Sequence, residues 1–166
     1  TWCAGGCCVL TKNRRKTMSR TENVELTVVC LLEDGDKFLL QDRVKTDWHG
    51  YALPGGHVEK DESFLDAVKR EMKEETGLEI RNPRLVGLKQ FPIDNGRYLV
   101  VLFKATEWSG ELTSSEEGKM EWVEYARLPK LDTVADLEEM LRMMNSPDLT
   151  ELRYVPNGDN WIAVIQ

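Results

Sequence analysis

The sequence has no apolar run long enough to cross a membrane, only 2 histidines and no excess of positive charge. A spanning helix needs about 18 or more apolar residues, whereas the apolar stretch 24–32 is interrupted by Glu25 and Thr27. Lys and Arg number 22 against 29 Asp and Glu, and the resulting net charge of −7 disfavours binding to a nucleic-acid backbone or an anionic membrane surface. We therefore expect no nucleic-acid partner and no membrane partner.

The cysteines are too few and too unevenly placed to form a metal site or a disulfide framework. Three of the 4, Cys3, Cys7 and Cys8, lie in the first eight residues without a paired C-x-x-C or a nearby His. A disulfide scaffold would spread its cysteines through the chain, so we expect a reducing, cytoplasmic location. Cys30 stands within an apolar strand pattern and is expected in the core.

A chain of 166 residues is long enough for one globular domain with a sizeable core. The first 20 residues combine Gly5-Gly6, the clustered cysteines and a basic run at 12–16, without the apolar centre of a secretory signal. We expect 1–20 to be a disordered or non-core tail and 21–166 to be the domain, with Met18 a candidate natural start. The alternative is that the tail is a basic targeting or interaction arm.

Hydrophobic periodicity predicts an α+β, or mixed α/β, fold. Residues 24–32 and 37–43 flank turn-forming residues and form a predicted β-hairpin. An amphipathic helix is expected over 63–76, with Ser63 as its N-cap and Gly77 as its stop. The remaining predicted elements are a second amphipathic helix over 133–145 and strands near 51–53, 78–80, 85–91, 98–106, 120–123 and 161–165.

Three glutamates, Glu71, Glu74 and Glu75, share one face of the first predicted helix. Their i, i+3, i+4 spacing places them within roughly a 100° sector, where like charges repel by a few tenths of a kcal/mol per pair. A hard divalent cation such as Mg²⁺ or Mn²⁺ would offset this repulsion, because it prefers oxygen ligands. Arg70 could hold one carboxylate by a bidentate contact. The alternative is an acidic face that is merely solvated.

The sequence around these glutamates fits one extended motif. From Gly56 to Leu78 the chain reads GHVEKDESFLDAVKREMKEETGL, which satisfies G-x5-E-x7-R-E-U-x-E-E-x-G-U, where U is an apolar residue. Seven specified residues at average usage of about 6% each would coincide about once in 10⁸–10⁹ placements. The motif is the Nudix box, and the chain resembles the Nudix hydrolase family, whose members hydrolyse nucleoside diphosphates linked to another group. The resemblance extends over about 22–145 and is strongest to the bacterial MutT-type branch, which is often assigned as 8-oxo-dGTP diphosphatases.

The resemblance implies a Nudix fold, in which a mixed β-sheet is sandwiched between α-helices, and a Mg²⁺ cofactor that Mn²⁺ could replace. It implies that Glu71, Glu74 and Glu75 are metal ligands together with the carbonyl of Gly55 or Gly56. Arg70 would orient these glutamates, and Glu62 would be its structural partner. Glu117, in preference to Glu116, would be a further metal ligand or the general base that activates water. The Glu116-Glu117 turn could also be simply solvated.

Other residues are candidates for substrate binding. Arg43 and Lys45 could hold phosphates, together with the backbone of Gly55 and Gly56, and His57 could approach a phosphate. Asp132 could bond a purine edge, although its residue type is equally expected near a helix start. Gly77 is expected to have a structural role, in the backbone conformation that ends the helix. Possible stacking surfaces, each of which could instead be a core residue, are Trp48, Tyr51, Phe91 and Tyr98.

The resemblance to the Nudix hydrolase family implies a Mg²⁺-dependent nucleotide pyrophosphohydrolase acting on a small-molecule nucleotide. The expected reaction converts a nucleoside triphosphate, with 8-oxo-dGTP as one candidate, into a monophosphate and pyrophosphate. The alternatives are a hydrolase of another nucleoside diphosphate derivative, such as ADP-ribose or a dinucleotide, and a nucleotide-binding module without catalysis. A monomer or a homodimer is expected.

Overall fold

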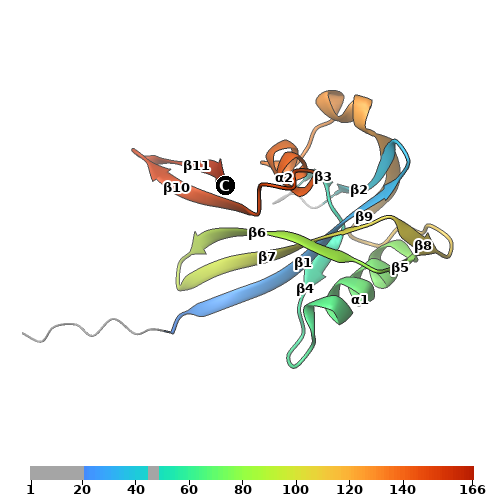
Figure 1. Ribbon diagram of the computed structural model, residues 1–166, viewed down its shortest axis with the longest axis horizontal. Helices are drawn as coiled ribbons and strands as arrows, with labels where there is room; N and C mark the ends of the chain where they lie inside the picture. The colour runs from blue at the N-terminus through green and yellow to red at the C-terminus, as the bar shows by residue number, and fades with distance from the viewer. Residues whose placement is uncertain (1–20, 45–48) are drawn as a thin grey trace, which may run out of the picture.

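Two long parallel neighbours, β1 (Asn23–Asp34) and β7 (Gly96–Ala105), form the centre of the fold in the computed structural model, which describes residues 21–44 and 49–166. The strand order of the main sheet is β11-β10-β6-β7-β1-β2-β3, with β4 also paired to β1 and β9 to β2 (Figure 1). The predicted tail, Lys45 and Trp48 lie outside the described residues. The other elements are β2 (Lys37–Arg43), β3 (Gly50–Ala52), β4 (Gly55–His57), α1 (Phe64–Thr76), β5 (Glu79–Arg81), β6 (Arg84–Ile93), β8 (Glu107–Ser109), β9 (Gly118–Glu124), η1 (Tyr125–Lys130), α2 (Leu137–Met144), β10 (Glu151–Asn157) and β11 (Asn160–Ile165).

The two helices pack on opposite faces of this sheet (Figure 1). Because side chains alternate along a strand, Cys30 and Leu32 pack into the cluster with α1, whereas Leu31 packs into the cluster with α2. The predicted mixed sheet between helices is therefore confirmed, as is the burial of Cys30. Within the described residues, no helix is both long and apolar enough to span a membrane.

Helix α1 begins and ends where the sequence predicts. The Ser63 hydroxyl accepts the backbone N–H of Asp66 at 3.1 Å, which satisfies one of the unpaired donors of the first turn. At the other end Gly77 has φ 76° and donates its N–H to the carbonyl of Lys73. A Cβ there would lie 2.6 Å from the carbonyl oxygen of Glu111, so this position requires glycine.

Two local predictions need correction. Helix α2 starts at Leu137 and not at 133, because the preceding backbone pairs with β3: Val134 N–H donates to the carbonyl of Tyr51 at 3.0 Å. The segment Gly55–His57, for which the sequence predicts no strand, is strand β4, antiparallel to β1. Both differences arise from pairing with residues distant in sequence, which local periodicity does not report.

The carboxyl-terminal residues form a hairpin of β10 and β11, of which the sequence predicts only the second strand. Parallel pairing between β10 and β6 joins Glu151–Arg153 to Leu88–Gln90. Beyond Arg153 the hairpin separates from β6 and extends past the sheet (Figure 1).

Candidate active site

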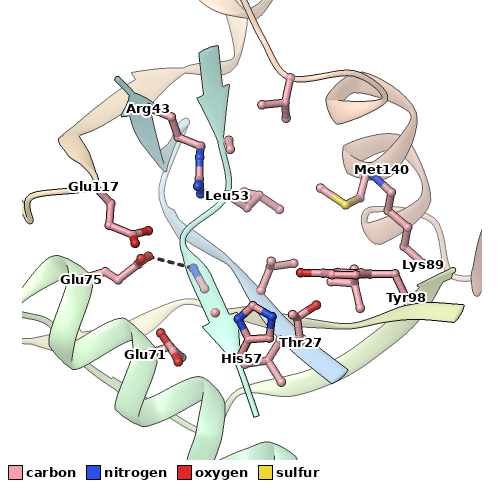
Figure 2. A pocket seen from close by; sticks show the side chains of 17 residues that line it. Thr27, Arg43, Leu53, His57, Glu71, Glu75, Lys89, Tyr98, Glu117 and Met140 are labelled. Carbon is pink, nitrogen blue, oxygen red and sulfur yellow. Dashed lines mark hydrogen bonds between the residues drawn. The ribbon is translucent and has the colours of Figure 1, made fainter. Parts of the chain in front are cut away.

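A cavity of about 380 Å³ lies beside β4, at the level where α1 faces β1. Figure 2 shows its two ends: Glu71, Glu75 and Glu117 gather at one, and Lys89, Tyr98 and Met140 lie at the other. The site is therefore acidic at α1 and largely apolar toward α2. The described residues that line it are Thr27, Val28, Val29, Arg43, Ala52, Leu53, Gly55, Gly56, His57, Glu71, Glu75, Lys89, Tyr98, Val100, Glu117, Val134 and Met140.

Glu75 is the most deeply buried of the box glutamates, at 8% exposure. Its Oε2 accepts the backbone N–H of Gly55 at 3.1 Å, which fixes the carboxylate at the cavity wall (Figure 2). Burial raises the pKa of Glu75 to about 7, against the opposing effect of the Gly55 N–H, and the nearby carboxylates of Glu117 and Glu71 raise this pKa further. The Glu117 carboxyl is thus close enough to Glu75 to disfavour a negative charge on both groups at once. A position favourable to positive charge therefore lies between them.

The glycines of β4 bring the backbone up against this cluster. A Cβ on Gly56 would lie 2.3 Å from Oε2 of Glu71. Any larger residue would displace the Glu71 side chain from its position beside the strand. The requirement for glycine at this end of the box is therefore steric.

Arg70 donates hydrogen bonds to three of the glutamates in the box. Its Nε and Nη2 donate to the two carboxylate oxygens of Glu62 at 2.8 and 2.9 Å, and Nη1 donates to Glu71 Oε1 at 2.8 Å and to Glu74 Oε2 at 3.2 Å. Nη2 also donates to the carbonyl of His57 at 3.0 Å. The Arg70 hydrogen bonds lower the pKa of Glu62 to about 2. Arg70 therefore joins α1 to the end of β4 and fixes the orientation of Glu71.

The raised pKa of Glu75 predicts how stability depends on pH in metal-free protein. Between pH 4.5 and about 7 the folded state binds a proton that the unfolded state lacks, so the unfolding free energy falls as pH rises through this window. Glutamine does not titrate, so we expect the unfolding free energy of Glu75→Gln to fall by about 1–3 kcal/mol less over this window than that of the unsubstituted protein. Each pKa unit corresponds to about 1.4 kcal/mol. Urea unfolding at pH 5 and pH 8 with EDTA measures this difference. An equal loss of unfolding free energy in both proteins would contradict the raised pKa of Glu75.

The donor set fits a divalent cation, although its side chains are not already closed around one. Among residues 21–44 and 49–166, no three His, Cys, Asp or Glu side chains form a ready-made metal group. The carboxylates of Glu75 and Glu117 nevertheless face each other, with Glu71 beside them (Figure 2). Oxygen-only ligands whose charges repel one another suit Mg²⁺ or Mn²⁺, which retains waters and substrate oxygens as further ligands.

The structure brings some of the predicted site residues together and leaves others apart. Arg43 lines the cavity with Glu117, whereas Glu116 is exposed. Glu74 lies outside the described lining, is 60% exposed and contacts Arg70, so its role as a metal ligand stays a prediction. Asp132 is also outside the lining, 82% exposed, with Oδ2 3.6 Å from His49 Nε2. Tyr51 lies outside the lining and donates to Glu121 at 2.9 Å. His57 lines the cavity, with its Nε2 2.7 Å from Glu25 Oε1.

Sequence reasoning missed a buried ion pair at the apolar end of the cavity. Lys89 of β6 is 8% exposed, and its Nζ lies 3.9 Å from Oδ2 of Asp136, just before α2. Burial lowers the pKa of Lys89 and raises that of Asp136. The one sequence signal for this pair was Lys89 itself, which lies two residues from Phe91 and so on the same face of the strand.

Comparison with known proteins identifies relatives of the whole core. Residues 24–144 match the NUDIX domain model. A MutT protein structure from Bacillus halodurans shares 31% identity and a TM-score of 0.69, covering 84% of this chain and 97% of that one. The Nudix hydrolase YvcI of Bacillus subtilis is 39% identical over 99 residues, 56% of this chain and 61% of YvcI. An ADP-ribose pyrophosphatase of Methanocaldococcus jannaschii is 36% identical over 105 residues, 61% of this chain and 62% of the relative. The chain thus spans about three-fifths of the length of these curated relatives.

Proposed function

Because this chain belongs to the Nudix hydrolase family, we propose that it is a Mg²⁺-dependent pyrophosphohydrolase that cleaves a nucleoside triphosphate into a monophosphate and pyrophosphate. The observation that carries the proposal is the approach of the Glu75 and Glu117 carboxylates in a cavity that Arg43 also lines. An oxidised purine nucleotide such as 8-oxo-dGTP is one candidate substrate, supported by the likeness to a MutT protein.

The acidic end of the cavity suits hydrolysis of a phosphoanhydride. A bound divalent cation would neutralise charge on the phosphates and lower the pKa of a coordinated water. Glu71 and Glu75 would provide carboxylate oxygens, with the Gly55 N–H keeping Glu75 in place. Glu117 would hold the cation or accept the proton of the attacking water. The water oxygen forms a new P–O bond while the anhydride P–O bond breaks, and pyrophosphate leaves.

The cationic Arg43 complements the charge of the substrate. It stands at the end of β2, across the cavity from the apolar wall, where a guanidinium could bind phosphate oxygens (Figure 2). The acidic net charge of the whole chain does not oppose this, because cations held by the carboxylates invert the charge locally.

A substrate panel tests the proposed function. Pyrophosphate and phosphate release are measured with and without Mg²⁺ for 8-oxo-dGTP, the ordinary NTPs and dNTPs, ADP-ribose and dinucleotides. Metal-dependent pyrophosphate release from a triphosphate is the expected result. Faster turnover of ADP-ribose would favour the second candidate, which the likeness to an ADP-ribose pyrophosphatase supports. Absence of metal-dependent turnover across the panel would overturn the proposal.

Arg70→Lys tests whether orientation of the glutamates matters to the reaction. A lysine cannot bond both oxygens of Glu62 while also reaching Glu71, so we expect kcat to fall about 10–100-fold, the usual effect of removing a group that orients metal ligands. Arg142→Lys on the exposed side of α2 is the matched control and should keep full activity. Normal kcat in Arg70→Lys would show that the hydrogen bonds of Arg70 are structural only.

A further inference from the structure

A second cavity, of about 430 Å³, lies between β6 and the carboxyl-terminal hairpin. Its volume is within the ~300–1,000 Å³ typical of small-molecule sites. Of the described residues that line it, Lys89 alone carries a charge. The lining consists of Lys89, Phe91, Pro92, Ala135, Tyr154 and Trp161.

The end of strand pairing opens this cavity. Pairing of β10 with β6 runs to Arg153 opposite Gln90, and the next residues along β6 are Phe91 and Pro92. Proline has no N–H to donate, so the ladder cannot continue through it. The hairpin begins at Glu151, beyond residue 144, where the match to the family domain model ends.

The cavity has a rigid aromatic frame. The rings of Phe91 and Tyr98 stack with centroids 4.9 Å apart and planes 10° apart, and Tyr154 meets Phe91 edge-on at 5.8 Å. Trp161 of β11 lines the same cavity and is 53% exposed, so an indole surface remains open to a flat ligand. Tyr98 also lines the catalytic cavity, so this frame joins the two cavities.

Lys89 is the polar group shared by both cavities. Its Nζ lies 5.9 Å from the ring centre of Phe91 and 5.8 Å from that of Tyr154. The separation of 3.9 Å from Asp136 Oδ2 is too long for a hydrogen bond, and that oxygen has no hydrogen-bond partner within the described part of the chain. The buried ammonium of Lys89 therefore keeps N–H groups that could donate hydrogen bonds to a ligand oxygen.

We propose that the second cavity binds the nucleobase of the substrate, stacked on Trp161, with a ring carbonyl accepting a hydrogen bond from Lys89. This rests on the proposed function, because the phosphates must lie at the glutamates while the base reaches past Lys89. The apolar walls favour an uncharged planar ring, and the ammonium disfavours a cationic one. The site therefore selects bases with a ring carbonyl, such as guanine or uracil, over adenine, which has none.

Binding of guanosine 5′-monophosphate without metal tests this subsite separately from catalysis. By calorimetry, Trp161→Ala should raise its Kd about 5–100-fold, in line with the usual contribution of base stacking. Trp161→Phe keeps a ring and should retain most of the affinity. The matched control is Ile162→Ala, an adjacent exposed residue outside the described lining, which should bind as the unsubstituted protein does. Lys89→Met should abolish the preference for guanosine over adenosine monophosphate.

The outcomes separate the subsite from the proposed function. Trp161-dependent binding in a protein that hydrolyses nothing would refute the pyrophosphohydrolase and support the base site. Metal-dependent hydrolysis with equal Kd and KM in the unsubstituted protein and Trp161→Ala would refute the base site alone. Failure of the unsubstituted protein to bind guanosine monophosphate would also overturn the base site.

Discussion

Glu75→Gln is expected to lower kcat about 10²–10³-fold, the size of effect seen when one transition-state stabilising group is removed. Glu75 is buried, is fixed by the Gly55 N–H, and faces Glu117 at the same end of the cavity. The amide keeps the shape of the side chain but removes the charge that would hold a cation. The rate of metal-dependent pyrophosphate release measures the effect.

The control for this substitution is Glu79→Gln. Glu79 lies just beyond α1, is 66% exposed and pairs with Lys73 at 3.0 Å, so the same chemical change removes charge far from the cavity. Its kcat should stay within about twofold of the unsubstituted protein, because exposed ion pairs contribute ~1 kcal/mol or less. Equal activity of Glu75→Gln and Glu79→Gln would refute the role of Glu75.

Gly55→Ala is expected to destabilise the fold by about 2–5 kcal/mol, combining backbone strain with overpacking. Gly55 has φ 154°, and a Cβ there would lie 2.1 Å from the carbonyl oxygen of Val28 on the paired strand. Neither atom can move without breaking the pairing of β4 with β1. Denaturant unfolding measures the loss of stability.

Gly35→Ala provides a matched comparison for this effect. Gly35 also has a positive φ, 65°, but a Cβ would meet nothing within 4 Å. It should therefore lose only the ~1–2 kcal/mol of left-handed strain. A Gly55→Ala protein no less stable than Gly35→Ala would show that β4 is not held against β1 as the structure describes.

The box predicted the acidic end of the cavity because its residues lie on one local element. Glu71, Glu75 and Arg70 belong to a single helix, whose hydrophobic periodicity and capping residues can be recognised within one short stretch of sequence. The common face of Glu71 and Glu75 follows from the 3.6 residues per turn of an α-helix. The prediction of Glu117 came from the resemblance to the family, and the structure places this residue beside Glu75.

The apolar end could not be predicted in the same way. Lys89 and Asp136 are 47 positions apart and meet only because β6 lies under the start of α2. The hairpin that covers Phe91 pairs with β6 through residues 60 or more positions later. Asp136 itself adopts a left-handed φ of 63°, which delays the start of α2 beyond the predicted position. These contacts depend on strand register, which hydrophobic alternation does not specify between distant segments.

The most direct test of the account is a Mn²⁺ titration of the unsubstituted protein, Glu75→Gln and Glu79→Gln, with free Mn²⁺ followed by electron paramagnetic resonance. The predicted result is that the unsubstituted protein and Glu79→Gln bind Mn²⁺ alike, whereas Glu75→Gln binds it at least ~10-fold more weakly. Equal Mn²⁺ affinity in all three proteins would contradict the claim that the carboxylate cluster at Glu75 and Glu117 is the metal-binding centre of this protein.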